Sequence, residues 1–144
     1  MTQQYAGQQY ELNVVHTLRK SLVFGDATAL TTFSMGWVPN QAAIVDAGIN
    51  VLTVFNAGTN NQMDIGYRNG GDGETDDLNE FATSVVLTTA GIIAADELTT
   101  AAVNIFPKGA EITCSLDLTS TAATTGRCIV WVQYIVDNDG DTAT

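Results

Sequence analysis

The 144-residue chain carries 16 Asp and Glu residues against five Lys and Arg residues, a formal net charge of −11. A chain this acidic repels phosphate groups, so we expect neither nucleic acid nor an anionic membrane among its partners. Apolar residues make up 45% of the sequence, enough for a core without metals or disulfides, so we expect no cofactor. We expect an extended N-terminal arm over residues 1–11 and one domain over residues 12–144.

The N-terminal arm is polar and contains the repeat QQY-AG-QQY, which includes Tyr5 and Tyr10. It has no apolar segment typical of a signal peptide, so we expect synthesis in a host cytoplasm without secretion. Arg19 and Lys20 follow shortly after the arm, whereas the rest of the chain is strongly acidic. We predict that these four residues contact a neighbouring protein subunit, the tyrosine rings supplying buried area and a hydroxyl group.

The first half of the chain is rich in β-branched residues and turn signals. We expect a break at Gly36 and a bulge or bend at Gly48. The segment NAGTNN predicts a hairpin loop. The expected extended segments are Leu12–Leu18, Ser21–Phe24, Ala29–Trp37, Ala42–Phe55 and Gln62–Tyr67.

The second half continues in the same manner after an acidic, Gly-rich loop over Asn69–Glu80. Segment Ile92–Leu98 suits either a strand or one helical turn. The other expected strands are Phe81–Thr88, Ala101–Phe106, Glu111–Leu118 and Cys128–Val136. Alternation in the last two predicts a core containing Ile112, Cys114, Leu116, Val130, Val132 and Tyr134. About eight or nine strands at this spacing predict an all-β protein, an antiparallel sandwich or barrel.

Few residues suggest catalytic chemistry. His16 is the single histidine and has no obvious nucleophile nearby in the sequence, so we interpret it as a polar strand residue. Cys114 and Cys128 fit two small buried residues better than a disulfide or half of a metal site. We therefore do not expect an enzyme.

Two acidic clusters are weak candidates for Ca²⁺ binding. Asp72, Glu74, Asp76 and Asp77 lie in the Gly-rich loop, where carboxylates could supply oxygen ligands. The tail residues Asp137, Asp139 and Asp141 resemble the start of an EF-hand loop, but the chain as given ends before a twelfth-position Glu. We favour solvated charge for both clusters and expect no metal.

The remaining conspicuous side chains are isolated in the sequence. Trp37 and Trp131 could stack on sugars, but core or interface positions are the better interpretation. The other three bases form no basic stripe; they are Arg68, Lys108 and Arg127.

Three segments resemble the decoration, or cement, proteins of tailed bacteriophage capsids: Gly36–Arg68, Phe81–Ile92 and Gly126–Asp137. The shared pattern is a Gly-x-x-Pro turn, a long strand ending in Phe-Asn-Ala-Gly, an Asp-Ile-Gly strand, an Asp/Gly-rich loop, a Thr-Ala-Gly turn and a final apolar strand containing Tyr. The resemblance implies a jelly-roll-like β-sandwich on the outer capsid surface of a virion. It also implies a homotrimer that bridges neighbouring major capsid protein subunits near local three-fold positions.

Other functions fit the same sequence. A head-fibre base or a tail structural protein would have a similar composition. A carbohydrate- or Ca²⁺-dependent binding module is a further alternative, and it would be expected to act as a monomer.

Overall fold

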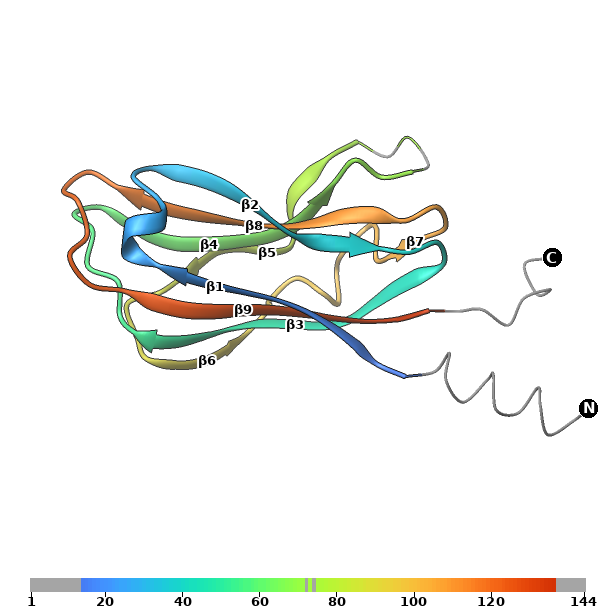
Figure 1. Ribbon diagram of the computed structural model, residues 1–144, viewed down its shortest axis with the longest axis horizontal. Helices are drawn as coiled ribbons and strands as arrows, with labels where there is room; N and C mark the ends of the chain where they lie inside the picture. Colours follow the sequence, from blue (N-terminus) through green and yellow to red (C-terminus); the bar gives the residue numbers. More distant parts are fainter. Residues whose placement is uncertain (1–13, 72, 74, 137–144) are drawn as a thin grey trace, which may run out of the picture.

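Nine β-strands form two antiparallel sheets packed face to face in the computed structural model, which describes residues 14–71, 73 and 75–136 (Figure 1). A short 3-10 turn, η1 (Phe24–Asp26), follows the first strand. In this part of the chain, no helix is long and apolar enough to cross a membrane. The strands are β1 (His16–Val23), β2 (Leu30–Val38), β3 (Ala42–Thr53), β4 (Asn60–Arg68), β5 (Asp77–Val86), β6 (Gly91–Ala94), β7 (Ile105–Phe106), β8 (Ala110–Thr119) and β9 (Arg127–Val136).

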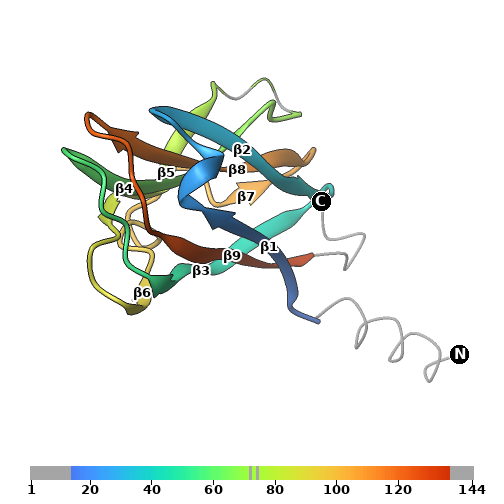
Figure 2. The same ribbon diagram turned by 60° about the vertical axis from the view of Figure 1, so that its left-hand side comes forward.

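The strand order is that of a jelly roll. One sheet runs β1-β9-β3-β6, with β7 also paired to β3, and the other runs β2-β8-β4-β5. Early strands pair with late ones, β1 with β9, β2 with β8, β3 with β6 and β4 with β5, as in a long hairpin rolled up on itself. Figure 2 shows the two sheets as separate layers. The predicted antiparallel β-sandwich of jelly-roll type is confirmed.

The core follows the alternation of β8 and β9. Ile112, Cys114, Leu116, Val130 and Val132 are buried as predicted, whereas Tyr134 is half-buried. Tyr134 lies near the end of β9, where it stacks on His16 at a ring-centroid distance of 5.1 Å. An aromatic cluster of Tyr67, Phe81 and Phe106 fills one region between the sheets.

Both cysteines are free thiols in the core, so the disulfide alternative is wrong for this structure. Cys114 lies on β8 and Cys128 on β9, which belong to opposite sheets. Burial raises the pKa of each thiol to about 12, and the two therefore behave as small apolar residues.

Several boundaries differ from the sequence-based expectation. β1 continues through Arg19 and Lys20, because pairing with β9 holds the whole segment extended. β5 begins at Asp77, inside the expected acidic loop, because Asp77 pairs with Tyr67. The predicted strand before Pro107 is reduced to the two residues of β7.

The prediction of a bulge at Gly48 is also wrong. The register of β3 shifts at Ile44/Asp46 and Val51/Thr53 instead. Gly48 is required by packing: a Cβ atom there would lie 2.5 Å from Cζ2 of Trp131. The predicted break at Gly36 is not seen, because β2 continues through this glycine; its pairing with β8 instead shifts register between Ser34 and Gly36.

Candidate protein-interaction surface

The outward side of the β1-β9-β3-β6 sheet carries exposed bases around an apolar centre. We call it the basic face and define it by Arg19, Arg127, Ile129, Trp131 and Ile92. Strand register places Arg19 beside Trp131, and Trp131 beside Gly48. The neighbouring row joins Ile129 of β9 to Asn50 of β3 and to Ile92 of β6. Residues one row apart on the same side of a sheet are within contact distance of long side chains.

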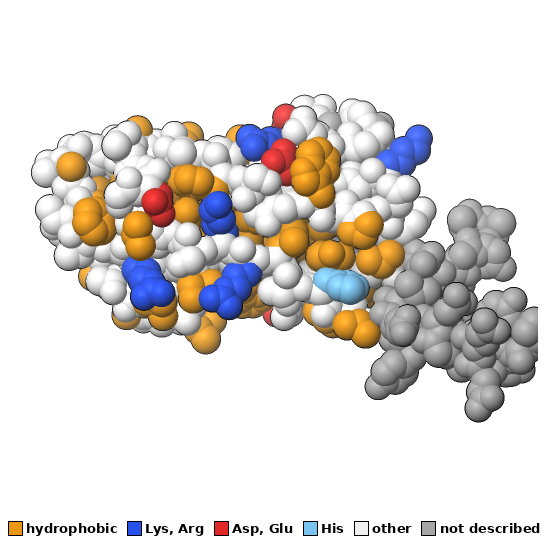
Figure 3. Space-filling model, in the orientation of Figure 1, with side chains coloured by type: hydrophobic (Ala, Val, Ile, Leu, Met, Phe, Trp, Pro, Cys, Tyr) orange, Lys and Arg blue, Asp and Glu red, His pale blue; other side chains and the backbone are white. Residues whose placement is uncertain are grey.

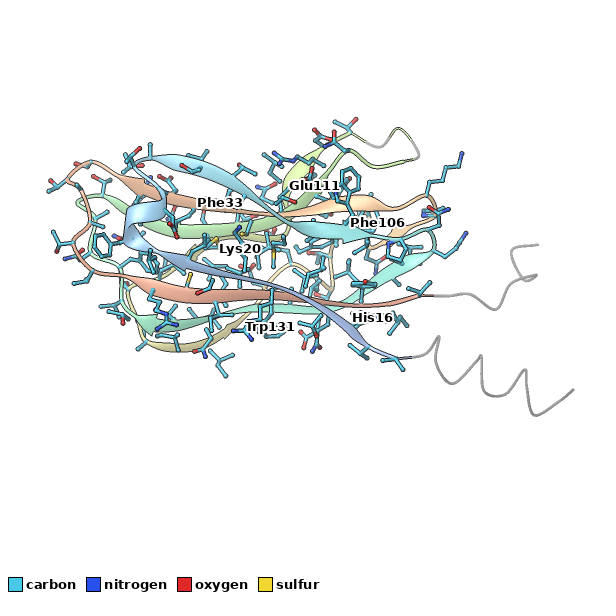
Figure 4. All side chains as sticks on the ribbon, in the orientation of Figure 1. His16, Lys20, Phe33, Phe106, Glu111 and Trp131 are labelled. Atoms are coloured by element: carbon cyan, nitrogen blue, oxygen red, sulfur yellow. The ribbon has the colours of Figure 1, made fainter. Side chains whose placement is uncertain are left out.

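Trp131 is the centre of the basic face. Its indole lies over Gly48, close enough that the glycine cannot carry a side chain. The ring is half-buried against its own sheet (Figure 4). Ile92 beside it is 75% exposed. Tryptophan held rigidly by its own strand loses little conformational freedom on contact with a partner, which is typical of interface anchors.

The two arginines on this face have no ion-pair partner among the residues that the structure describes. The strands of this sheet contain one acid, Asp46, whose Oδ1 accepts a hydrogen bond from the Ala47 N–H at 2.9 Å. In Figure 3, Lys and Arg side chains lie among hydrophobic side chains over β1 and β9. Unpaired guanidinium groups beside an indole suit contact with an acidic and partly apolar protein surface.

Lys20 points away from the basic face. It lies on the inward side of β1, where its Nζ is 5.7 Å from the centre of the Phe33 ring at the edge between β1 and β2 (Figure 4). Arg19 and Lys20 therefore do not form one patch, although both lie on β1. Their role in binding a neighbouring subunit stays a prediction.

The outward side of the β2-β8-β4-β5 sheet is polar, and we call it the acidic face. At one end, Arg68 binds Glu111 through Nε–Oε1 at 2.8 Å and Nη2–Oε2 at 3.3 Å. Asn69 donates a further hydrogen bond to Glu111 at 3.0 Å. Arg68, followed by Ser34, lowers the pKa of the Glu111 carboxyl from 4.5 to about 2. Arg68 is therefore neutralised locally and adds no positive charge to this face.

The other acids of this face lie close to one another. Burial raises the pKa of Asp64, and the nearby Asp117 and Glu97 add to the shift, while the Ser84 N–H opposes it. One row across the sheet runs from Leu30 through Asp117 and Gln62 to Val86. Leu30 and Val86, at its two ends, are 62% and 52% exposed. Trp37, beside Glu111, is 60% exposed, so neither tryptophan belongs to the core.

A pocket of about 200 Å³ opens at the end of the sandwich near η1. Its lining is small and mainly apolar and contains no titratable side chain, so it offers no groups for acid–base or nucleophilic chemistry. The lining residues are Phe24, Gly25, Ala27, Thr28, Leu118, Ser120, Ala122 and Ala123. His16 lies on β1 and stacks on Tyr134, in agreement with a polar strand residue.

Several residues predicted to bind partners or metal lie outside the described part of the chain. They are Tyr5, Tyr10, Asp72, Glu74, Asp137, Asp139 and Asp141. Of the remaining loop acids, Asp76 accepts a hydrogen bond from the Asn69 N–H and Asp77 from the Asn79 N–H. Within the described ranges, no group of three or more His, Cys, Asp or Glu residues is placed to hold a metal ion. The expectation that this loop carries solvated charge stays a prediction.

The basic face was not identified from the sequence, where Arg19, Arg127 and Trp131 are treated separately. The sequence did contain part of the information, because alternation along β9 puts Arg127, Ile129 and Trp131 on one side of the strand. The contribution of Arg19 depends on the pairing of β1 with β9, which no local pattern specifies.

No protein-family model and no curated protein sequence matches this chain. Its fold is similar to that of chains in three phage capsid structures. A chain in the capsid of Ralstonia phage GP4 is 17% identical, with a TM-score of 0.57 over 88% of this chain and 86% of its own. A chain in the acidic stable capsid of Helicobacter pylori bacteriophage KHP30 is 12% identical, with a TM-score of 0.58 over 85% and 88%. A chain in the cyanophage Pam1 capsid asymmetric unit is 12% identical, with a TM-score of 0.54 over 85% of each chain.

Proposed function

We propose that this chain is a non-enzymatic virion structural protein that decorates a phage capsid and stabilises it by bridging neighbouring major capsid protein subunits. The observation that carries the proposal is the likeness in fold, over at least 85% of the chain, to chains of three phage capsids. The sequence resemblance to decoration proteins supports the same function independently.

The surface of the sandwich suits this role. The basic face presents an indole and two unpaired guanidinium groups, whereas the chain as a whole is acidic. A chain of this overall charge would remain soluble and would not bind the packaged DNA, and its basic face suits contact with an acidic protein surface. We further propose a homotrimer at local three-fold positions of the outer capsid surface.

Electron microscopy of the native particle tests the location. Antibody against this chain should label the whole head surface, and particles stripped of the protein should rupture at lower temperature than decorated ones. Label confined to one vertex would indicate a head-fibre base, and label on the tail a tail protein. Either result would contradict a decoration role.

The N-terminal arm provides a second test. We propose that residues 1–11 lie across a neighbouring subunit, with Tyr5 and Tyr10 buried in the contact. Deleting Met1–Glu11 should leave the circular dichroism spectrum and melting temperature of the isolated protein nearly unchanged while reducing binding to stripped particles at least tenfold. Replacing both tyrosines by Ser should also reduce binding to stripped particles. Unchanged binding of the truncated protein would assign the contact to the sandwich alone.

A further inference from the structure

Charge is divided between the two sheets. The strands of the β1-β9-β3-β6 sheet carry three bases and one acid, which are Arg19, Lys20, Arg127 and Asp46. The strands of the β2-β8-β4-β5 sheet carry one base and five acids, which are Arg68, Asp64, Asp77, Glu80, Glu111 and Asp117. Lys20 lies on the inward side of β1, so the outward basic face carries Arg19 and Arg127 against Asp46. On the other sheet Arg68 is bound to Glu111, while Asp64 and Asp117 have no base paired with them in the described part of the chain. The basic face is therefore net positive and the acidic face net negative.

Both faces also expose apolar side chains next to their charges. On the basic face, Arg19 lies beside Trp131, and the nearby Ile92 is 75% exposed. On the acidic face, Asp117 lies beside Leu30, which is 62% exposed. The basic face thus combines an aromatic residue with an arginine, and both residue types are enriched at protein interfaces.

We propose that copies of this chain bind one another with the basic face of one copy on the acidic face of the next. Arg19 and Arg127 of one copy would then lie against the carboxylates of Asp64 and Asp117 of its neighbour, with Trp131 beside Arg19 and Ile129 between the two arginines. A basic face meeting a second basic face would bring like charges together, and the same holds for two acidic faces. Charge complementarity within the molecule thus selects this arrangement over a symmetric pair.

The area that the basic face can cover is small, which is typical of a weak contact. The ten residues of β9 span about 33 Å, and three neighbouring strands about 14 Å, so roughly 500 Å² per partner can be covered. The total of about 1,000 Å² is at the lower end for specific interfaces, so we expect micromolar affinity. Because the two contacting faces differ, the contact repeats, and it either closes into a ring or extends along a lattice.

This inference concerns contacts between copies and does not depend on the virion role proposed above. The experiment below is done in solution with the purified full-length chain. Its failure therefore leaves the particle-labelling experiment unaffected, and the reverse is also true.

Sedimentation velocity over about 1 to 200 µM should show reversible association of the wild-type chain. The double variant Arg19→Glu/Arg127→Glu should associate at least tenfold more weakly, because both faces are then acidic. The double variant Asp64→Lys/Asp117→Lys should also associate at least tenfold more weakly, because lysine ammonium groups then face the arginines of the neighbouring copy. An equimolar mixture of the two variants should recover association, since each basic face again meets an acidic one.

A third variant, Asn40→Glu/Thr89→Glu, adds negative charge at exposed positions outside both faces and should associate as the wild type does. Thermal unfolding checks that all variants are folded, and the recovery in the mixture is itself evidence of folded partners. A wild-type chain that stays monomeric at 200 µM overturns the proposal. Normal association of the Asp64→Lys/Asp117→Lys variant also overturns it, and would indicate pairing through the basic faces alone or binding by another surface.

Discussion

At the scale of single residues, one polar cluster stands out at an end of the acidic face. Glu111 is 10% exposed and accepts hydrogen bonds from Arg68 and Asn69. A nearly buried carboxylate requires such partners, because an unpaired buried charge is strongly destabilising. The sequence provided no indication of this pair, since Arg68 and Glu111 are 43 positions apart in the chain and strand pairing brings them together.

The lowered pKa of Glu111 predicts that the stability of the protein depends on pH. Its folded-state pKa is lowered to about 2, so its contribution to stability is complete above about pH 4.5 and is lost as the pH falls towards 2. Glu111→Gln should lower the free energy of unfolding by about 1–2 kcal/mol at pH 7. The difference from wild type, measured by urea unfolding, should shrink below pH 4.5. Arg68→Met removes the same pair and should show the same trend; a difference independent of pH would contradict the assignment.

At the scale of strands, glycines mark places where backbone or ring approaches the sheet closely. Gly48 accommodates Trp131, and Gly66 of β4 accommodates the backbone at the start of β5. The register of β4 with β5 shifts on both sides of Ile65, so the segment around Leu78 lies over β4. The sequence suggested a bulge at Gly48, because a glycine in a strand pattern indicates either a bulge or a close approach, and local sequence does not distinguish them.

Gly66→Ala tests this close approach. The added Cβ would lie 2.2 Å from the carbonyl oxygen of Asp77 and 2.3 Å from the carbonyl carbon of Leu78, both backbone atoms that must move. We expect destabilisation of about 1–3 kcal/mol or more, measured by denaturant unfolding. Gly25→Ala is the matched control, because nothing lies within 4 Å of its added Cβ. Equal stability of the two variants would show that β5 adjusts freely.

At the scale of the whole molecule, two sheets enclose one core and leave two outward faces of different character. Val130 and Val132 of β9 lie inside, and Ile129 and Trp131 outside. The jelly-roll order places the basic strands β1 and β9 together on one side and most strand acids on the other. This division of charge belongs to the tertiary structure, because Arg19 and Arg127 are more than a hundred residues apart.

Val132→Asp tests the position of the core. Val132 is fully buried, so an aspartate there would be an unpaired charge in an apolar environment. We expect a loss of at least about 3 kcal/mol in the free energy of unfolding. Gln133→Asp introduces the same group one residue later, on the outward side, and should change stability by much less. A Val132→Asp variant that melts within a few degrees of the wild type would mean that this side of β9 is exposed.

The sequence alone determined the fold class, most strands and five of the six core residues predicted for β8 and β9. It could do so because alternating polarity and turn residues are local properties, set by the two-residue period of a strand. The tertiary structure decided where β1 and β5 begin, why Gly48 is a glycine, and which distant residues share a face. Strand register and sheet order depend on pairings between residues far apart in the chain, and the basic face, the acidic face and the Arg68–Glu111 pair exist through those pairings.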